Sequence, residues 1–353
     1  MLELLSENEN LWTKLQKTNK PIVIYGMGDG AIKIMNVCED YGIKIAEIFA
    51  SDDHVRGNSF LGYEVKTLAK LEEEYEDFII LLAFAAFEEG LMNKIYSIAE
   101  RHELYAPDVP VFGDGLFTLE YIKDNEDKFD FAYNKLADDY SKKVYTQLLN
   151  FKVSGKIHYL KNISTTRNED YSELIPLNNG MTYVDLGAYD GDTIEEILSH
   201  GITPKRIIAF EPDPKNFRKL TNNTEKYDNV EIHNIGSYNV KATLSFNNRA
   251  GRNSALGSNG KHIEIPVNSV DNILNGDEVH YIKMDVEGAE YETILGCKEC
   301  INRFKPALGV AAYHRNEDLF KLPELILSFN SNYKLYIRHN HYIPAWESIF
   351  YAI

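Results

Sequence analysis

Residues 182–193 read Thr182-Tyr183-Val184-Asp185-Leu186-Gly187-Ala188-Tyr189-Asp190-Gly191-Asp192-Thr193, and this segment decides the fold of the 353-residue chain. Its first five residues predict a buried strand, and the apolar spacing from Thr193 to Leu198 predicts a helix. Two glycines in the connecting turn allow the backbone to approach a ligand closely. The segment therefore predicts a nucleotide-type site at the carboxyl end of a strand.

The charge of this turn argues against a phosphate cradle. The turn carries aspartates and no lysine, whereas a phosphate-binding loop needs a Gly-Lys-Ser/Thr sequence. S-adenosylmethionine suits such a turn, because it has a sulfonium, an ammonium and a ribose diol but no phosphate. We therefore expect S-adenosylmethionine as the cofactor. The candidates around its methionine end are Asp185, Gly187, Ala188, Tyr189, Gly191, Asp192 and Thr193.

The alternation of strands and helices continues to the end of the chain. Further strands are predicted at residues 206–210, 230–234, 280–284, 307–312, 333–338 and 348–352. A loop without a helical pattern joins the last two, so we expect them to pair antiparallel within a parallel sheet. This arrangement predicts the class I methyltransferase fold, a doubly wound seven-stranded α/β sheet with a C-terminal antiparallel hairpin.

Ligands of open parallel sheets bind at the carboxyl ends of the strands. The predicted strand ends that should meet there are Asp185, Glu211, Gly236 and Asp285. Glu211 follows Gly187 by 24 residues, the spacing at which a carboxylate accepts two hydrogen bonds from a ribose diol. Pro212 lies in the same turn. No acidic residue follows the third strand, so adenine should contact backbone and apolar groups near Gly236 and Ser237.

A second cluster reads Ile282-Lys283-Met284-Asp285-Val286-Glu287-Gly288-Ala289-Glu290. Lys283 and Asp285 alternate along a strand, and Glu287 and Glu290 fall on one face of the helical turn that follows. Acids at such a position orient an acceptor hydroxyl, bind a metal ion or stabilise the helix by their charge. The metal ion is the least favoured of these, because no nearby His or Asn completes an oxygen-rich octahedral set. We expect none.

Three motifs in this order resemble those of the FkbM methyltransferase family: the turn at 184–193, Phe210-Glu211-Pro212-Asp213-Pro214, and the cluster at 282–290. The resemblance extends over about residues 136–353. It implies methyl transfer from S-adenosylmethionine, usually to a hydroxyl of a sugar or polyketide-like metabolite. Some similar bacterial members carry an N-terminal Rossmann-like unit and lie in glycan or surface-polysaccharide pathways. We therefore expect O-methylation of a sugar or glycan-related hydroxyl, on a small molecule, a glycan or a nucleotide-linked sugar.

Methyl transfer to oxygen is an in-line displacement, so catalysis depends mainly on holding the acceptor oxygen close to the methyl group. A base is needed only as the hydroxyl loses its proton. His314, Asp285 and His339 all follow predicted strand ends. His314 is the preferred base, because the helix after it begins only near Glu317. Lys283 and Glu287 are candidates for placing the acceptor.

A separate strand and glycine turn begin the chain. Gly26-Met27-Gly28-Asp29-Gly30-Ala31 matches Gly-x-Gly-x-x-Ala, and a later strand ends at Ser51-Asp52-Asp53, where a carboxylate could hold a ribose. We expect a Rossmann-like domain over 1–112, a helical connector over 113–176 and the methyltransferase domain over 177–353. One alternative function is an NAD-dependent oxidoreductase, which the absence of a Tyr-x-x-x-Lys pair disfavours. The other is a non-catalytic scaffold in a glycan pathway.

The composition excludes several partners. A net charge of -17 argues against nucleic acid and against anionic membranes as the main partner. The most apolar run, residues 78–87, is too short to span a bilayer, so we expect no stable membrane insertion. Three cysteines and an acidic N-terminus without a secretory signal predict a cytoplasmic protein. The sequence carries no feature that sets an oligomeric state.

Overall fold

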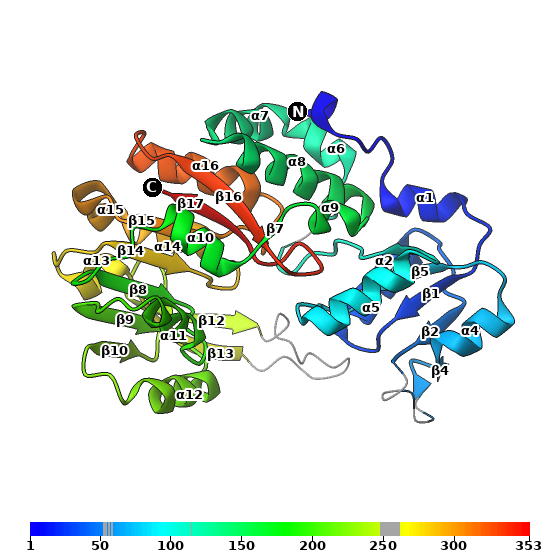
Figure 1. Cartoon of the computed structure of the whole chain (residues 1–353), viewed down its shortest axis with the longest axis horizontal. Coiled ribbons are helices and arrows are strands. Elements are labelled where there is room, and N and C mark those ends of the chain that lie inside the picture. The colour runs from blue at the N-terminus through cyan, green and yellow to red at the C-terminus, as the bar shows by residue number, and fades with distance from the viewer. Residues whose placement is uncertain (52–54, 56, 58, 114, 248–261) are drawn as a thin grey trace.

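A computed structural model describes residues 1–51, 55, 57, 59–113, 115–247 and 262–353. Asp52 and Asp53, the predicted ribose carboxylates of the first domain, lie outside these residues. Figure 1 shows two α/β units at opposite ends of the molecule, with the helices of residues 119–161 across the top between them. The N-terminus lies beside these helices, where the 3-10 helix η1 (Leu2–Leu4) contacts α6 (Leu119–Asp124).

The N-terminal unit is a six-stranded sheet with the order β3-β4-β2-β1-β5-β6. Its strands are β1 (Ile22–Tyr25), β2 (Glu47–Phe49), β3 (Ser59–Phe60), β4 (Tyr63–Lys66), β5 (Ile79–Leu82) and β6 (Glu103–Tyr105). Its helices are α1 (Leu11–Lys17), α2 (Asp29–Asp40), α4 (Leu68–Glu74) and α5 (Glu89–Ala99). All pairs are parallel except β3 with β4. The β1 and β5 strands are buried throughout, as a parallel sheet covered on both faces requires.

The connector consists of α6 (Leu119–Asp124), α7 (Glu126–Lys135), α8 (Asp139–Ser154), α9 (His158–Lys161) and α10 (Arg167–Leu174). The side chain of Asp138 accepts from Ser141 N at 2.6 Å and caps α8. Ser141 Oγ in turn accepts from Ile337 N at 3.1 Å, and Asp138 pairs with Arg338 at 2.9 Å. The start of this helix therefore packs against the strand that contains Ile337 and Arg338.

The C-terminal unit is an eight-stranded sheet with the order β10-β9-β8-β14-β15-β17-β16-β7. Its strands are β7 (Ser164–Thr165), β8 (Thr182–Leu186), β9 (Arg206–Phe210), β10 (Val230–His233), β14 (Tyr281–Met284), β15 (Ala307–Ala311), β16 (Leu335–Asn340) and β17 (Ser348–Ala352). The predicted number of seven strands is corrected to eight, because the short connector strand β7 pairs with β16 at the edge. The β17 strand is antiparallel to both β15 and β16.

A small three-stranded sheet, β11-β13-β12, was not predicted. It consists of β11 (Gly236–Ser237), β12 (Ala242–Asn247) and β13 (His262–Asn268). Gly236 therefore begins a strand of this sheet and does not end β10, as the sequence had suggested. The remaining helices are α11 (Asp192–Ser199), α12 (Pro214–Thr224), α13 (Val270–Leu274), α14 (Glu290–Leu295), α15 (Lys298–Phe304) and α16 (Asp318–Phe329).

The two α/β units touch through backbone hydrogen bonds. Ala86, after β5, and Ile343, after β16, exchange two of them, at 2.8 and 2.9 Å. Phe112 N donates to His314 O at 3.2 Å. One hydrophobic core runs from the first sheet through the connector to the second. In the described part of the chain, no helix combines the length and the apolar character that crossing a membrane requires.

Candidate active site

The predicted cofactor turn lies against the ends of two neighbouring strands. Gly187 N and Ala188 N both donate to Phe210 O, at 3.0 and 2.9 Å, which ties the turn to β9. Gly187 has a φ of 77°, and a Cβ there would lie 1.9 Å from the carbonyl oxygen of Asp285. Only glycine fits this contact between the end of β8 and the end of β14. The backbone of the turn is therefore fixed on both sides.

Glu211 is locked to the same turn. Its Oε2 accepts from Tyr189 N at 2.9 Å, and its Oε1 accepts from Asp213 N at 2.8 Å. The residue is 6% exposed, and burial raises the pKa of its carboxyl group while the two amide hydrogen bonds oppose that rise. Each oxygen keeps lone pairs for a further donor. The contact of Glu211 with a ribose remains a prediction.

One large cleft runs from this turn to the interface with the N-terminal unit. The predicted site residues that line it are Lys283, Gly187, Tyr189, Asp192, Thr193, Glu211, Pro212, Gly236, Ser237, Asp285, Glu287 and His314. Asp185 and Ala188 are fully buried beneath the turn. Gly191, with a φ of 91°, precedes α11, and a Cβ there would lie 3.2 Å from Leu220. These three residues shape the turn from below.

Asp185, a predicted cofactor residue at the methionine end, is fully buried and does not offer its carboxylate directly to a ligand. Its Oδ1 lies 3.2 Å from Lys283 Nζ, and Lys283 also donates to Gly187 O at 3.0 Å. Burial raises the pKa of Asp185 and Lys283 opposes that rise. Burial disfavours the charge of Lys283, yet Asp185 and Asp285 together raise its pKa. Lys283, with its side chain 16% exposed, is therefore a cation at the cleft that ties Asp185 to the turn, and its role in placing the acceptor stays a prediction.

Asp285 presents an ionised carboxylate to the cleft, with its side chain 27% exposed. Tyr313 OH donates to its Oδ1 at 3.0 Å, and His314 Nε2 lies 3.6 Å from the same oxygen. Burial alone would raise the pKa of Asp285, but Lys283, His314 and the tyrosine hydroxyl lower it below the ordinary value. Of the three predicted bases, Asp285 is the one that reaches the cleft with a free acceptor lone pair.

His314 is held as a buried cation. Its Nδ1 lies 2.8 Å from Glu290 Oε1, and its Nε2 lies 3.5 Å from Glu287 Oε2. Burial would lower the pKa of His314, but Glu290, Asp285 and Glu287 raise it to about 9. An imidazolium at neutral pH has no lone pair to accept a proton. The preference for His314 as the base is therefore corrected.

His339 is a structural residue. It is fully buried, and its nitrogens lie 3.1 Å from Ser348 Oγ and 3.2 Å from Tyr342 O, within the β16–β17 connection. Burial lowers its pKa to about 3. Because its ring is enclosed between two strands and makes both of its hydrogen bonds there, the prediction of a catalytic His339 is wrong.

In the described part of the chain, the group most suited to a metal ion consists of Asp285, Glu290 and His314. Ligand atoms of Asp285, Glu290 and His314 lie within 4.8 Å of one another. However, Glu290 faces Nδ1 of the ring and Asp285 faces Nε2. One ion bound to a single ring nitrogen would not reach both carboxylates without rearrangement. The geometry is that of an imidazolium held between acids.

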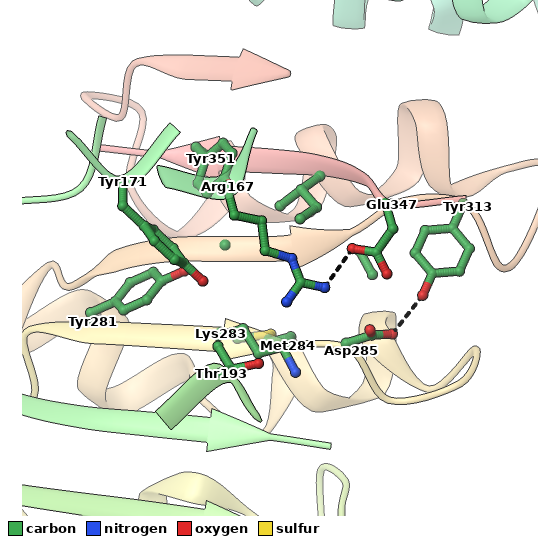
Figure 2. Close-up of a pocket in the computed structure, with 13 residues that line it drawn as sticks. Arg167, Tyr171, Thr193, Tyr281, Lys283, Met284, Asp285, Tyr313, Glu347 and Tyr351 are labelled. Atoms are coloured by element: carbon green, nitrogen blue, oxygen red, sulfur yellow. Dashed lines mark hydrogen bonds and ion pairs between the residues drawn. The ribbon is translucent and has the colours of Figure 1, made fainter. Parts of the chain in front are cut away.

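Two parts of the site were missed from the sequence. Ile265 and Val267, on β13, join Phe210 and Ile235 as an apolar wall of the cleft beside Glu211. The alternating pattern of β13 was a signal for this strand. Arg167, from α10, and Glu347, before β17, pair at 2.8 Å in a small pocket beside Asp285 and Tyr313, as Figure 2 shows. Nothing local in the sequence indicates that α10 reaches this pocket.

The glycine turn of the N-terminal unit reaches the rim of the cleft through Asp29 and Lys33. A Cβ on Gly30 would lie 2.2 Å from Ala83 O, so this glycine serves the packing of α2 against the end of β5. Asp29 occupies the first turn of α2 and pairs with Lys33 at 3.4 Å. Its negative charge disfavours a pyrophosphate at this helix N-terminus.

The strand order, the glycine turn and the cleft at the strand ends define a methyltransferase-like α/β protein. Residues 185–342 match the family model described as the methyltransferase FkbM domain. This match agrees with the resemblance that the three sequence motifs indicated. No curated protein sequence gives a significant match to the chain.

A solved structure shares this fold over nearly the whole chain. The chain is similar to methyltransferase FkbM from Methylobacillus flagellatus KT, with a TM-score of 0.76 and 22% identity over 99% of this chain and 95% of that chain. The likeness therefore includes the N-terminal sheet and the connector. An rRNA methylase from Streptococcus thermophilus matches 53% of this chain and 92% of its own, with a TM-score of 0.35 and 11% identity. Fibrillarin from Aeropyrum pernix, in complex with S-adenosyl-L-methionine, matches 51% of this chain and 69% of its own, with a TM-score of 0.34 and 12% identity.

Proposed function

We propose that this protein transfers a methyl group from S-adenosylmethionine to a hydroxyl of a sugar or glycan. The observation that carries the proposal is the lock between Glu211 and the glycine turn, in which Glu211 accepts from Tyr189 N at 2.9 Å. This bond sets a buried carboxylate next to a close-approach turn at the ends of neighbouring strands, as a ribose-binding site requires. The three cysteines are free and buried, which supports a reducing cytoplasmic location.

The donor set of the cleft suits S-adenosylmethionine. Asp192 and Glu211 supply acceptors for ammonium and hydroxyl groups, and Ile265 and Val267 supply an apolar surface for adenine. No lysine or arginine lies among residues 187–193 to neutralise a phosphate. When bound, this cofactor supplies a methyl group on a positively charged sulfur. The turn and Glu211 hold it and orient it toward the end of β14.

The acceptor side of the proposal rests on Asp285. Its carboxylate is ionised, faces the cleft and accepts from Tyr313 OH at 3.0 Å. An acceptor hydroxyl that donates to the same carboxylate would be oriented, and its proton would have an acceptor as the new bond forms. The positive charges of Lys283 and His314 lower the pKa of Asp285 and so keep its carboxylate ionised. The protein therefore contributes mainly position and charge.

Titration calorimetry with S-adenosylmethionine tests the cofactor. We expect binding to the wild-type protein, and a loss of about 1.5 to 3 kcal/mol in Glu211→Ala, because hydrogen bonds to a charged group are lost. Glu225→Ala removes an exposed acid at the end of α12 and is the control. Absence of binding to the wild-type protein would overturn the proposal. Tight binding of NAD instead would favour the oxidoreductase.

The catalytic part needs a separate measurement. Tritiated S-adenosylmethionine and a panel of sugars and glycans should give labelled, base-stable methyl ethers. If the protein binds S-adenosylmethionine and labels none of them, the non-catalytic scaffold becomes the better interpretation.

A further inference from the structure

Three aromatic side chains line the cleft where the two α/β units meet. They are Phe87, from the segment after β5, and Tyr342 and Trp346, from the β16–β17 connection, and we call them the aromatic wall. The rings of Phe87 and Tyr342 stack with centroids 5.5 Å apart and planes at 16°. Those of Tyr342 and Trp346 lie 5.9 Å apart at 33°. Phe87 is 59% exposed, the most exposed of the large apolar residues described.

The backbone beneath the aromatic wall is fixed. Ala86, next to Phe87, and Ile343, next to Tyr342, exchange two hydrogen bonds across the domain interface, at 2.8 and 2.9 Å. Both of these residues are fully buried. The backbone that carries the rings is therefore fixed by the packing of the two units. Because exposed apolar surface is unfavourable, an aromatic surface exposed in a cleft indicates a binding role.

The aromatic wall continues directly into the pocket beside Asp285. Glu347 follows Trp346, so their Cα atoms are about 3.8 Å apart. Glu347 lines the small pocket together with Asp285 and Tyr313 and pairs there with Arg167 at 2.8 Å (Figure 2). A ligand that reaches Asp285 along this side of the cleft therefore has the aromatic wall next to it.

The charge of the cleft restricts the ligand. Twelve acidic residues line it against seven lysines and arginines. Acids remain in excess when His314 is counted as a cation and Asp318 as uncharged, so the field of the cleft disfavours phosphate, sulfate and carboxylate groups. An uncharged sugar ring suits both features of the cleft. Its C–H face packs on an aromatic ring, which the ring's negative π-face favours, and its hydroxyl groups donate to carboxylates.

From these observations we propose that the aromatic wall binds an uncharged sugar ring adjacent to the ring that is methylated. The acceptor would then be an uncharged saccharide of two or more rings that spans the interface between the two α/β units. The inference rests on the proposed function, because it takes Asp285 as the position of the reacting hydroxyl. It gives the N-terminal unit a part in selecting the acceptor through Phe87.

An array of uncharged and acidic glycans, probed in the presence of S-adenosylhomocysteine, tests the inference. We expect the wild-type protein to bind uncharged glycans of at least two rings. Loss of one stacking ring in Phe87→Ala or Trp346→Ala should weaken binding about tenfold, and Phe87→Tyr should retain it. Phe131→Ala is the matched control, since Phe131 is 38% exposed on α7, outside the cleft.

Fluorescence gives a second readout. The chain has two tryptophans, Trp12 and Trp346, and Trp12 is buried. Titration with the best array glycan should change the emission of Trp346 in the wild-type protein and much less in Phe87→Ala. The proposal is overturned if only acidic glycans bind, if no glycan binds, or if the two alanine variants bind as the wild-type protein does. Unchanged S-adenosylmethionine affinity in these cases would leave the cofactor part of the proposed function standing.

Discussion

His314 Nδ1 lies 2.8 Å from Glu290 Oε1, and both side chains are 1% exposed. The neighbouring acids raise the pKa of His314 from 6.5 to about 9. The folded protein therefore retains this proton at pH values where the unfolded chain releases it. The resulting stabilisation is complete below pH 6.5 and is lost as the pH rises through about 9.

The variant His314→Gln tests this relationship. Removing one partner of a buried pair should lower the free energy of unfolding by about 3 to 5 kcal/mol at pH 6.5. The loss should shrink toward pH 9, which urea denaturation at several pH values measures. His233→Gln breaks a more exposed pair with Glu231, with side chains 24% and 41% exposed, and should cost less than about 1 kcal/mol. A loss for His314→Gln that is equal at every pH would contradict the pairing.

Substitution of the nearby Asp318 should change the stability in the opposite direction. Burial and the charge of Glu290 raise its pKa to about 8, so the folded state favours its protonated form. The stability that comes from this proton is lost as the pH rises from 3.8 through about 8. An amide needs no proton, so Asp318→Asn should be more stable than the wild-type protein above pH 8. Thermal unfolding at pH 6 and 9 measures the difference.

The pair between Lys283 and Asp185 gives a third prediction. Lys283→Met leaves the fully buried carboxyl of Asp185 without its cation at 3.2 Å, so we expect a loss of about 3 to 5 kcal/mol. Asp185→Asn combined with Lys283→Met should recover much of this loss, which a double-mutant cycle in urea measures. Lys321→Met is the control, because Lys321 is 50% exposed. Additive effects of the two substitutions would show that the pair does not stabilise the fold.

The strands that the sequence predicts well are those made mostly of apolar residues. The predicted bounds 182–186, 206–210 and 348–352 are those of β8, β9 and β17, because strands buried on both faces are rich in apolar residues. The β12–β13 pair escaped prediction although its residues alternate. β12 ends at Asn247 and β13 begins at His262. Pairing between strands this far apart in the sequence leaves no local signal of the pairing.

The roles of the two histidines show a different limit. His314 and His339 both follow strand ends, so both are candidate bases in the sequence, and only the later start of the next helix makes His314 the preferred one. Their pKa values move in opposite directions, to about 9 and about 3, because one contacts three carboxylates and the other contacts a hydroxyl and a carbonyl. These neighbours are brought together by the tertiary fold, so proton affinity follows from the structure alone.

The identity of the base gives the last prediction. Asp285 is ionised, whereas His314 would have to lose a proton with a pKa of about 9. If Asp285 receives the hydroxyl proton, kcat should be nearly flat between pH 6 and 8. If His314 did so, kcat would rise about tenfold with each pH unit over that range. The assay is transfer from tritiated S-adenosylmethionine to a glycan that the protein labels.

Asp285→Asn should lower kcat by about 100-fold or more, because the amide neither accepts the proton nor carries the charge. The affinity for S-adenosylmethionine, measured by calorimetry, should change only a few-fold, since Glu211 and the turn keep their contacts. Tyr313→Phe removes the hydrogen bond of 3.0 Å to Asp285 but leaves the carboxylate, so its loss of kcat should be smaller. If Asp285→Asn has an unchanged kcat, Asp285 is excluded as the group that receives the proton, because the amide cannot accept it.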